Sequence, residues 1–139
     1  MIEQVFEFIV NHYLLIGLFA ALVFAFMVNE GKRGGDSITT NTLINLVNRD
    51  SAVILDVRDS KDFSAGHIVD AVNIPVSNFD KRAVELEKFK DRPIIVVCKM
   101  GQHASGIGGK LKTLGFEKVH RLGGGMGEWS ASSLPVVKD

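Results

Sequence analysis

The side chain in this sequence that is best suited to covalent chemistry is the thiol of Cys98, the only cysteine among 139 residues. Cys98 follows an uninterrupted β-branched run at residues 94–97, which is typical of an interior strand of a parallel sheet. Open α/β sheets bind their ligands at the carboxyl ends of such strands. A loop and a helix start follow, so the sulfur is well placed to be held as a thiolate. The alternative is a small buried side chain that only fills the core, as most free cysteines do.

The loop after Cys98 supplies groups that could stabilise negative charge on its sulfur. Gly101 allows the backbone to turn, so that successive amides face inward as an anion-binding nest. Lys99 and His103 could add positive charge beside this nest, although a loop lysine is as often merely solvated. We predict Cys98 as the catalytic nucleophile. The predicted substrate-binding loop consists of Lys99, Met100, Gly101, Gln102 and His103.

The composition excludes several other classes of function. The chain has 16 basic and 16 acidic side chains and no basic stripe, so we expect no nucleic-acid partner. A single cysteine excludes an internal disulfide and a Cys-x-x-Cys zinc or thioredoxin motif. We therefore expect no metal and no cofactor, and any sulfur chemistry must finish on another molecule.

The N-terminal segment has the composition of a membrane anchor. Residues 13–28 carry no charged or strongly polar side chain, and residues 5–10 are apolar apart from Glu7. The first segment alone is somewhat short of the ~20 residues that a bilayer-crossing helix needs, and the second could extend it. A cleaved signal peptide would have positive charges before the apolar core and a small-residue cleavage site after it. A retained anchor therefore explains this segment better than a signal peptide or the core helix of a soluble protein.

The charges that flank the anchor predict its orientation. Lys32 and Arg33 follow the apolar segment, and no Lys or Arg precedes it. The positive-inside rule then places the C-terminal part in the cytoplasm, where a reducing environment suits an unpaired thiol. We divide the chain into an anchor at residues 1–30 with a single span at about 9–28, a polar linker at 31–37 and one domain at 38–139.

Strand and helix patterns alternate through this domain, which predicts an α/β fold with a mainly parallel sheet and helices on both faces. We predict strands at residues 52–57, 71–74, 94–98 and 118–122. We predict helices at residues 40–47, 60–65, 81–89, 105–114 and 126–131, the first two capped by Thr40 or Asn41 and by Ser60.

The helix predicted after Cys98 has an unusual number of glycines near its start. Gly106, Gly108 and Gly109 each cost about 1 kcal/mol of helix stability relative to alanine. We interpret them as a place where another segment of backbone approaches closely. The alternative is a mobile active-site helix that adapts to a partner.

Five motifs in this order resemble those of rhodanese-like domains. They are Leu-Asp-Val-Arg at 55–58, Phe-Ser-Ala-Gly-His-Ile at 63–68, Ala-Val-Asn-Ile-Pro at 71–75, Cys-x-x-Gly-x-x at 98–103, and three glycines at 123–125 followed by Glu128 and Trp129. The layout, one N-terminal helix and one such domain, resembles the membrane-anchored single-domain rhodaneses of Gram-negative bacteria. The resemblance implies a rhodanese-like fold and a single-pass protein of the bacterial inner membrane, with the domain facing the cytoplasm.

The resemblance also implies an enzyme, a sulfurtransferase. In this family the loop cysteine attacks a small sulfur donor such as thiosulfate and holds the sulfur as a persulfide. A nucleophile such as cyanide, or the thiol of an acceptor protein, then removes it. Two other functions remain open: an interaction module that docks on a membrane protein without using Cys98, and redox or persulfide sensing by the same thiolate.

Two loop positions limit this interpretation. Many rhodaneses have arginine at the last loop position, where this chain has His103, so we expect weak activity with free thiosulfate that improves as the pH falls toward 6. Cysteine phosphatases need arginine at the sixth position after the cysteine, and Ala104 stands there. We therefore do not expect phosphatase activity.

We interpret the remaining signature residues as structural. Asp56 and Arg58 should close a strand end and pair with each other or with neighbouring backbone. His67, which follows a glycine and has no cysteine or carboxylate companion, should be a hydrogen-bonded turn histidine and not a metal ligand. Trp129 should pack the last helical turn onto the domain.

Overall fold

The computed structural model describes residues 1–138, and positions 30–33 by their backbone alone. The chain forms two compact units, Met1–Lys32 and Arg33–Asp139, which we describe separately. The side chains of Lys32 and Arg33, on which the predicted orientation depends, lie outside the described part, as does position 139 at the predicted end of the domain.

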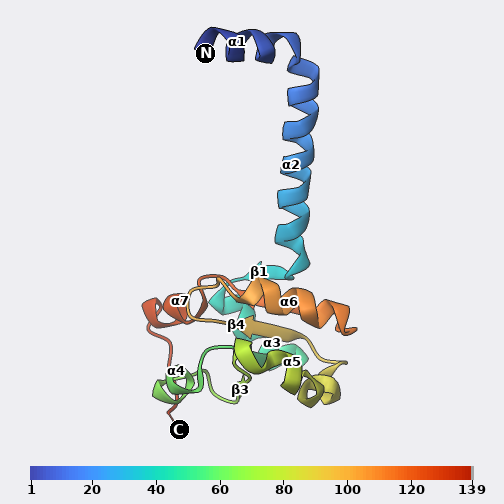
Figure 1. Cartoon of the computed structure of the whole chain (residues 1–139). Coiled ribbons are helices and arrows are strands. Elements are labelled where there is room, and N and C mark those ends of the chain that lie inside the picture. The colour runs from blue at the N-terminus through green and yellow to red at the C-terminus, as the bar shows by residue number, and fades with distance from the viewer. Residues whose placement is uncertain (139) are drawn as a thin grey trace. The chain divides into compact units, whose positions relative to one another are not determined.

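The N-terminal unit contains two helices, α1 (Ile2–Asn11) and α2 (Tyr13–Arg33), with a sharp bend between them (Figure 1). The helix breaks at His12, whose φ of −123° and ψ of 26° leave the helical region. The prediction of one continuous helix over about 9–28 is therefore wrong. Asn11, His12 and Tyr13 all have modest helix propensity, which explains why the break falls there and not within the Leu- and Ala-containing segment that follows.

Neither helix alone meets the length and hydropathy expected of a membrane span. Ile2–Asn11 and Tyr13–Asn29 meet these criteria only together, and they are bent by 84° relative to each other.

The second unit is built on a five-stranded sheet in which every neighbouring pair is parallel, as the alternating pattern predicted. The spatial order is β1-β5-β4-β2-β3, with β4 in the centre between β5 and β2. The strands are β1 (Asp36–Ile38), β2 (Val53–Asp56), β3 (Val72–Asn73), β4 (Ile94–Val97) and β5 (Val119–Leu122).

The first strand lies where the sequence predicted a linker. β1 pairs with β5 through Asp36–His120, Ser37–Arg121 and Ile38–Leu122, and α2 continues to Arg33, so the predicted linker at 31–37 is wrong. Gly35 has a φ of +88°, and a Cβ there would lie 2.4 Å from the carbonyl oxygen of Val119. Only glycine lets the chain enter the sheet edge at this distance.

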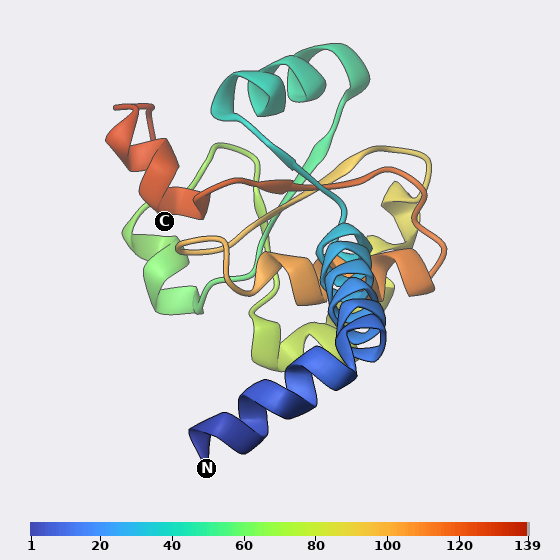
Figure 2. The same ribbon diagram turned by 90° about the horizontal axis from the view of Figure 1, so that it is seen from above.

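Helices cover both faces of the sheet, as predicted (Figure 2). Along β4, Ile94 and Val96 contribute to one buried cluster and Ile95 and Val97 to the other, because successive side chains of a strand point to opposite faces. The first cluster packs under α5 and α6, and the second under α3 and α7. The helices are α3 (Thr40–Asp50), α4 (Ser60–Ala65), α5 (Phe79–Arg82), α6 (Ala104–Thr113) and α7 (Gly125–Ala131), with 3₁₀ segments η1 (Val76–Asn78) and η2 (Ala83–Phe89).

Three local details differ from the predictions. The cap of α3 is Thr39, whose side chain accepts a hydrogen bond from the Thr42 backbone N–H at 3.2 Å. The cap of α4 is Asp59, not Ser60, and its side chain makes no capping hydrogen bond. The single helix predicted at 81–89 is a short α-helix followed by a tighter 3₁₀ segment.

One of the three glycines near the start of α6 explains how this helix packs. A Cβ on Gly108 would lie 2.0 Å from the carbonyl oxygen of Gly34, and a Cβ on Gly34 would lie 2.5 Å from the Ser105 Cα. The segment before β1 thus crosses α6 backbone to backbone, which confirms the predicted close approach at Gly108. Gly106 faces open space, so close approach does not explain that position.

Candidate active site

Cys98 lies at the carboxyl end of β4, the central strand of the sheet. Its side chain is 1% exposed and belongs to the cluster that faces α6. The helix before β4, α5, and the helix after it, α6, both pack on the face of the sheet that Cys98 faces. The helix that joins β1 to β2, α3, packs on the opposite face. The sulfur therefore occupies the end of the sheet at which parallel α/β proteins bind their ligands.

The loop after Cys98 returns to its sulfur through Gly101. The Gly101 backbone N–H donates to Cys98 Sγ at an N···S distance of 2.8 Å. Gly101 has a φ of +94°, which a residue with a side chain adopts only under strain. The loop ends where α6 begins, at Ala104. The backbone amides in the first turn of α6 therefore lie close to the loop that follows Cys98. A fixed N–H donor at the sulfur stabilises negative charge on a thiolate or on a persulfide.

A second set of contacts holds the loop from the side of α7. The Met126 N–H donates to the Cys98 carbonyl at 2.8 Å, and the Gly127 N–H donates to the Lys99 carbonyl at 2.9 Å. These bonds direct two carbonyl oxygens, which would repel an anion, toward the start of α7. A Cβ on Gly125 would lie 2.2 Å from the Cys98 oxygen, so only glycine permits this approach.

The sequence interpretation treated residues 123–125 only as part of a family motif and assigned no role to Met126 or Gly127. Three successive glycines before a short helix were the available signal. Such a run lets two segments of backbone meet at hydrogen-bonding distance.

The other loop side chains are exposed and point to different surroundings. Met100 is 59% exposed, and its Sδ lies over Gly127, where an added Cβ would be 2.7 Å away. Gln102 and His103 are also exposed, and the His103 side chain makes no capping hydrogen bond to α6. Both therefore remain available to a molecule that approaches the loop from solvent.

Lys99 lines a cavity of about 270 Å³ beside α7. Cys98 packs in the buried cluster that faces α6, whereas Lys99 is exposed and lines this cavity, so the two neighbouring side chains have different surroundings. Charge from Lys99 thus acts on this cavity, while the Gly101 amide acts directly on the sulfur. The lining residues are Arg58, Asp62, Ala65, Gly66, Lys99, Met126, Ser130 and Val136.

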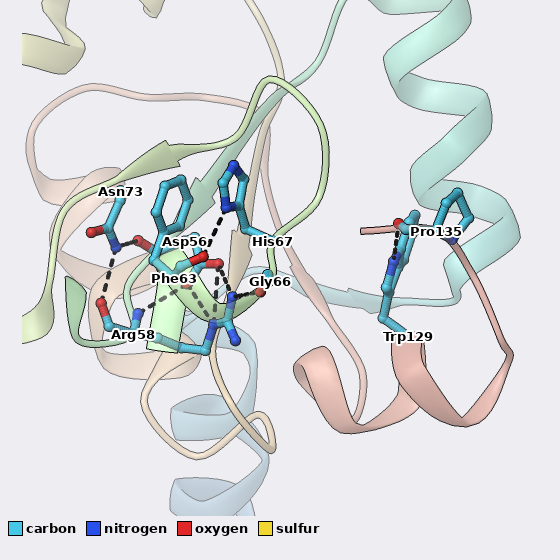
Figure 3. Close-up of polar contacts among 8 residues, drawn as sticks. All are labelled: Asp56, Arg58, Phe63, Gly66, His67, Asn73, Trp129 and Pro135. Carbon is cyan, nitrogen blue, oxygen red and sulfur yellow. Dashed lines mark hydrogen bonds and ion pairs between the residues drawn. The ribbon is translucent and has the colours of Figure 1, made fainter. Parts of the chain in front are cut away.

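Asp56 and Arg58 form a buried ion pair at the end of β2 (Figure 3). Arg58 Nε lies 3.0 and 3.1 Å from the two carboxylate oxygens of Asp56, and Nη2 donates to Oδ2 at 2.7 Å. Arg58 Nη2 also donates to the Gly66 carbonyl at 2.8 Å, and Asn73 Nδ2 donates to the Asp56 and Arg58 carbonyls at 3.0 Å each. The network ties β2 to β3 and to the end of α4. Asn73 lies in one of the recognised motifs, but the sequence interpretation gave it no role.

His67 and Trp129 are both buried and both make hydrogen bonds to backbone (Figure 3). His67 Nδ1 lies 2.8 Å from the Phe63 carbonyl, and its ring stacks on Phe63 at a centroid distance of 3.7 Å. Trp129 Nε1 donates to the Pro135 carbonyl at 3.0 Å and packs in the cluster under α3 and α7. These contacts tie His67 to α4 and Trp129 to the chain segment that follows α7.

In the part of the chain that the structure describes, no three His, Cys, Asp or Glu side chains come together as a metal site would require. The candidate site consists of a buried thiol, the Gly101 amide that contacts it, and a nearby cavity whose charged lining residues are Arg58, Asp62 and Lys99.

Together these features define a rhodanese-like site. They are a cysteine directly after the central parallel strand, a six-residue loop closed on its sulfur, and the glycine run at 123–125 that brings α7 against this loop. Residues 39–132 match the family described as Rhodanese-like domain. The chain belongs to this family.

Three relatives illustrate the similarity. The protein YibN of Escherichia coli (strain K12) is 32% identical over 140 residues, which cover 98% of each chain. The thiosulfate sulfurtransferase GlpE of Pseudoalteromonas translucida is 35% identical over 95 residues, covering 68% of this chain and 89% of that one. The solved rhodanese-like domain of the Anabaena protein Alr3790 has a TM-score of 0.65 and 29% identity, covering 76% of this chain and 80% of that one.

Proposed function

We propose that this protein is a membrane-anchored sulfurtransferase that carries sulfane sulfur as a persulfide on Cys98. The donor is thiosulfate or another persulfide, and the acceptor is a small thiol or a protein thiol. The observation that carries the proposal is the 2.8 Å hydrogen bond from the Gly101 N–H to Cys98 Sγ within the six-residue loop. The relatives named thiosulfate sulfurtransferase support the same reaction class.

The first half of the reaction loads the enzyme. The Cys98 thiolate attacks the outer sulfur of thiosulfate, a new S–S bond forms to Sγ, and the original S–S bond breaks to release sulfite. In the second half an acceptor thiolate attacks the outer sulfur of the persulfide. The Cys98–sulfur bond breaks, the acceptor leaves as a persulfide, and Cys98 returns as a thiolate. No external oxidant or reductant is required.

The geometry around the sulfur favours both anionic forms of Cys98. The Gly101 N–H reaches Sγ directly, and the carbonyls of Cys98 and Lys99 are held by α7. A site organised in this way needs little rearrangement as charge moves from the thiolate to the leaving group. Because Cys98 itself is 1% exposed, the transferred sulfur provides the reach toward an acceptor at the surface.

The N-terminal unit supports attachment to the bacterial inner membrane, with the catalytic domain on the cytoplasmic side. Large apolar side chains of α2 such as Leu14, Phe19 and Phe24 are between 67% and 74% exposed, and no other part of the described unit covers them. Lipid would cover this surface. The basic pair at 32–33, together with the absence of Lys or Arg before it, favours the stated orientation.

The test is intact-mass spectrometry of the full-length chain, purified in detergent and incubated with thiosulfate or with an organic polysulfide. We expect a gain of one sulfur atom, its removal by a thiol acceptor, and no gain in Cys98→Ser. The absence of an adduct from either donor would contradict the enzyme proposal. In that case binding of a membrane protein that survives Cys98→Ser would point to an interaction module.

A further inference from the structure

The first helix of the N-terminal unit has one polar and one apolar face. Glu3, Glu7 and Asn11 recur every four residues and therefore share one side of α1. On the other side Ile2, Val5, Phe6 and Ile9 form an apolar strip, with exposures of 87%, 55%, 69% and 46%. This strip is large for a ten-residue helix exposed to water, so something must cover it.

The second helix has a different pattern. From Tyr13 to Val28 it carries apolar side chains on all sides and has no polar face. A helix of this kind suits the interior of a bilayer, whereas a two-faced helix suits its surface. The change from one pattern to the other occurs at His12, the residue at which the helix bends.

The bend at His12 is built from specific contacts. The His12 backbone N–H donates to the Phe8 carbonyl at 3.0 Å, and His12 Nδ1 lies 3.0 Å from the same oxygen. The His12 ring also stacks on the Phe8 ring at a centroid distance of 4.4 Å. The Phe8 carbonyl in the last turn of α1 is thus contacted twice by His12 at the corner, where α1 ends instead of continuing into α2.

We infer that α1 lies flat in the lipid–water interface on the non-cytoplasmic side of the membrane that α2 enters. This inference rests on the proposed membrane attachment. If α2 crosses the bilayer near its normal, the 84° bend makes α1 nearly parallel to the membrane plane. Its apolar strip then faces the acyl chains, and Glu3 and Glu7 face water.

The charges of α1 favour this side of the membrane and this depth. The segment before residue 32 contains no Lys or Arg, so it has no side chain that would be drawn to an anionic cytoplasmic surface. If α1 instead continued into the hydrocarbon, Glu7 would have to be buried there with no Lys or Arg nearer along the chain than Lys32. An interfacial position leaves Glu7 hydrated and still removes Ile9 from water.

The experiment uses the full-length chain with Cys98→Ser, in which an introduced cysteine is the only thiol. Glu7→Cys and Ile9→Cys form a matched pair, because the two positions lie on nearly opposite sides of α1. A membrane-impermeant maleimide is added to spheroplasts, and to purified protein in liposomes of phosphatidylethanolamine and phosphatidylglycerol. Labelling after denaturation in SDS corrects for the amount of protein.

We expect Glu7→Cys to react about tenfold faster than Ile9→Cys in both preparations, because lipid covers only the apolar strip. Equal and fast labelling would place α1 in water, and equal and slow labelling would place it inside the hydrocarbon; either result would overturn the inference. Protection of Ile9→Cys in spheroplasts but not in liposomes would show that a protein covers the strip, and would overturn it as well.

The result is independent of the enzymatic part of the proposed function. Carbonate extraction of the same membranes tests the anchor, and sulfur loading of the unmodified chain tests Cys98. An anchored, active protein with equal labelling at positions 7 and 9 would contradict only the interfacial helix. A protein that carbonate releases would contradict the anchor itself.

Discussion

At the residue scale, the properties of Cys98 depend on groups that are not themselves reactive. Gly101 provides an N–H that reaches the sulfur, and Met126 and Gly127 hold the neighbouring carbonyls away from it. The buried thiol thus acquires its proposed reactivity from backbone geometry. Substitutions that alter this backbone should affect sulfur loading before they affect folding.

Gly101→Ala tests the contribution of that backbone. A residue with a side chain at a φ of +94° is strained by about 1–3 kcal/mol, and the loop is expected to relax by moving the N–H away from Sγ. Loss of such a donor should lower the rate of sulfur loading from thiosulfate by about 10²-fold, measured by single-turnover mass spectrometry. Gly106→Ala is the control, because nothing lies within 4 Å of an added Cβ there. An unchanged loading rate in Gly101→Ala would remove the amide from the mechanism.

His103→Arg tests the departure from the arginine that many rhodaneses carry. His103 is exposed at the end of the loop, so an arginine fits there without displacing other side chains. A fixed positive charge that can bind an oxyanion bidentately should raise kcat/KM for thiosulfate about tenfold. An unchanged kcat/KM for thiosulfate in the variant would exclude a charge effect at this position.

The buried pair of Asp56 and Arg58 supports a third prediction. Arg58→Ala removes the guanidinium from a carboxylate that is 1% exposed, and an unpaired buried charge destabilises a fold by about 3–5 kcal/mol. Urea denaturation should show this loss in the free energy of unfolding. Arg82→Ala is the comparison: it breaks an exposed pair with Glu85 and should change stability little. Equal effects of the two variants would mean that the Asp56 carboxylate is better hydrated than its burial indicates.

At the scale of elements, α6 carries two glycines with opposite environments. Gly108 crosses Gly34 at a distance that leaves no space for a Cβ, whereas Gly106 faces open space. Both sit in the same helix, so helix propensity treats them alike and only packing distinguishes them. The sequence showed the glycines but not which of them is in contact, because the partner at position 34 lies far away along the chain.

This difference predicts effects of opposite sign. Gly106→Ala should stabilise the fold by about 1 kcal/mol through helix propensity. Gly108→Ala should destabilise it by about 1–3 kcal/mol, because the added Cβ would force the two segments apart. The free energies of unfolding from urea titrations of the two variants provide the measurement. If both variants were stabilised, the Gly34–Gly108 crossing would not exist in solution.

At the scale of the whole molecule, the second unit begins in sequence with an edge strand of its own sheet. β1 begins three residues after α2 ends, and the Ile38 carbonyl accepts a hydrogen bond from the Gly123 N–H at 3.0 Å. Gly123 opens the glycine run that positions α7 against the loop of Cys98. The start of the domain is therefore linked to the candidate site through one edge of the sheet.

Two shortened chains test this link. A chain of residues 33–139 keeps Gly34, Gly35 and β1, whereas a chain of residues 39–139 lacks all three. We expect the shorter chain to melt at least about 4 °C lower, since the loss of β1 exposes an edge of β5 and leaves Gly123 without its acceptor. Sulfur loading should fall as well. Equal melting temperatures, measured by calorimetry, would show that β1 contributes nothing to the domain.

The sequence by itself determined the parallel α/β class, the central strand before Cys98 and the loop after it, because short local patterns of residues indicate buried strands and turns. Contacts between distant segments were decided only by the tertiary structure. β1 is a three-residue edge strand with mostly exposed side chains, so it has no hydrophobic periodicity by which to be recognised. Three contacts depend on how the strands are ordered in the sheet. They are the crossing of Gly34 and Gly108, the hydrogen bonds of Asn73 to two carbonyls, and the packing of α7 against the loop. A linear pattern contains no direct signal for that order.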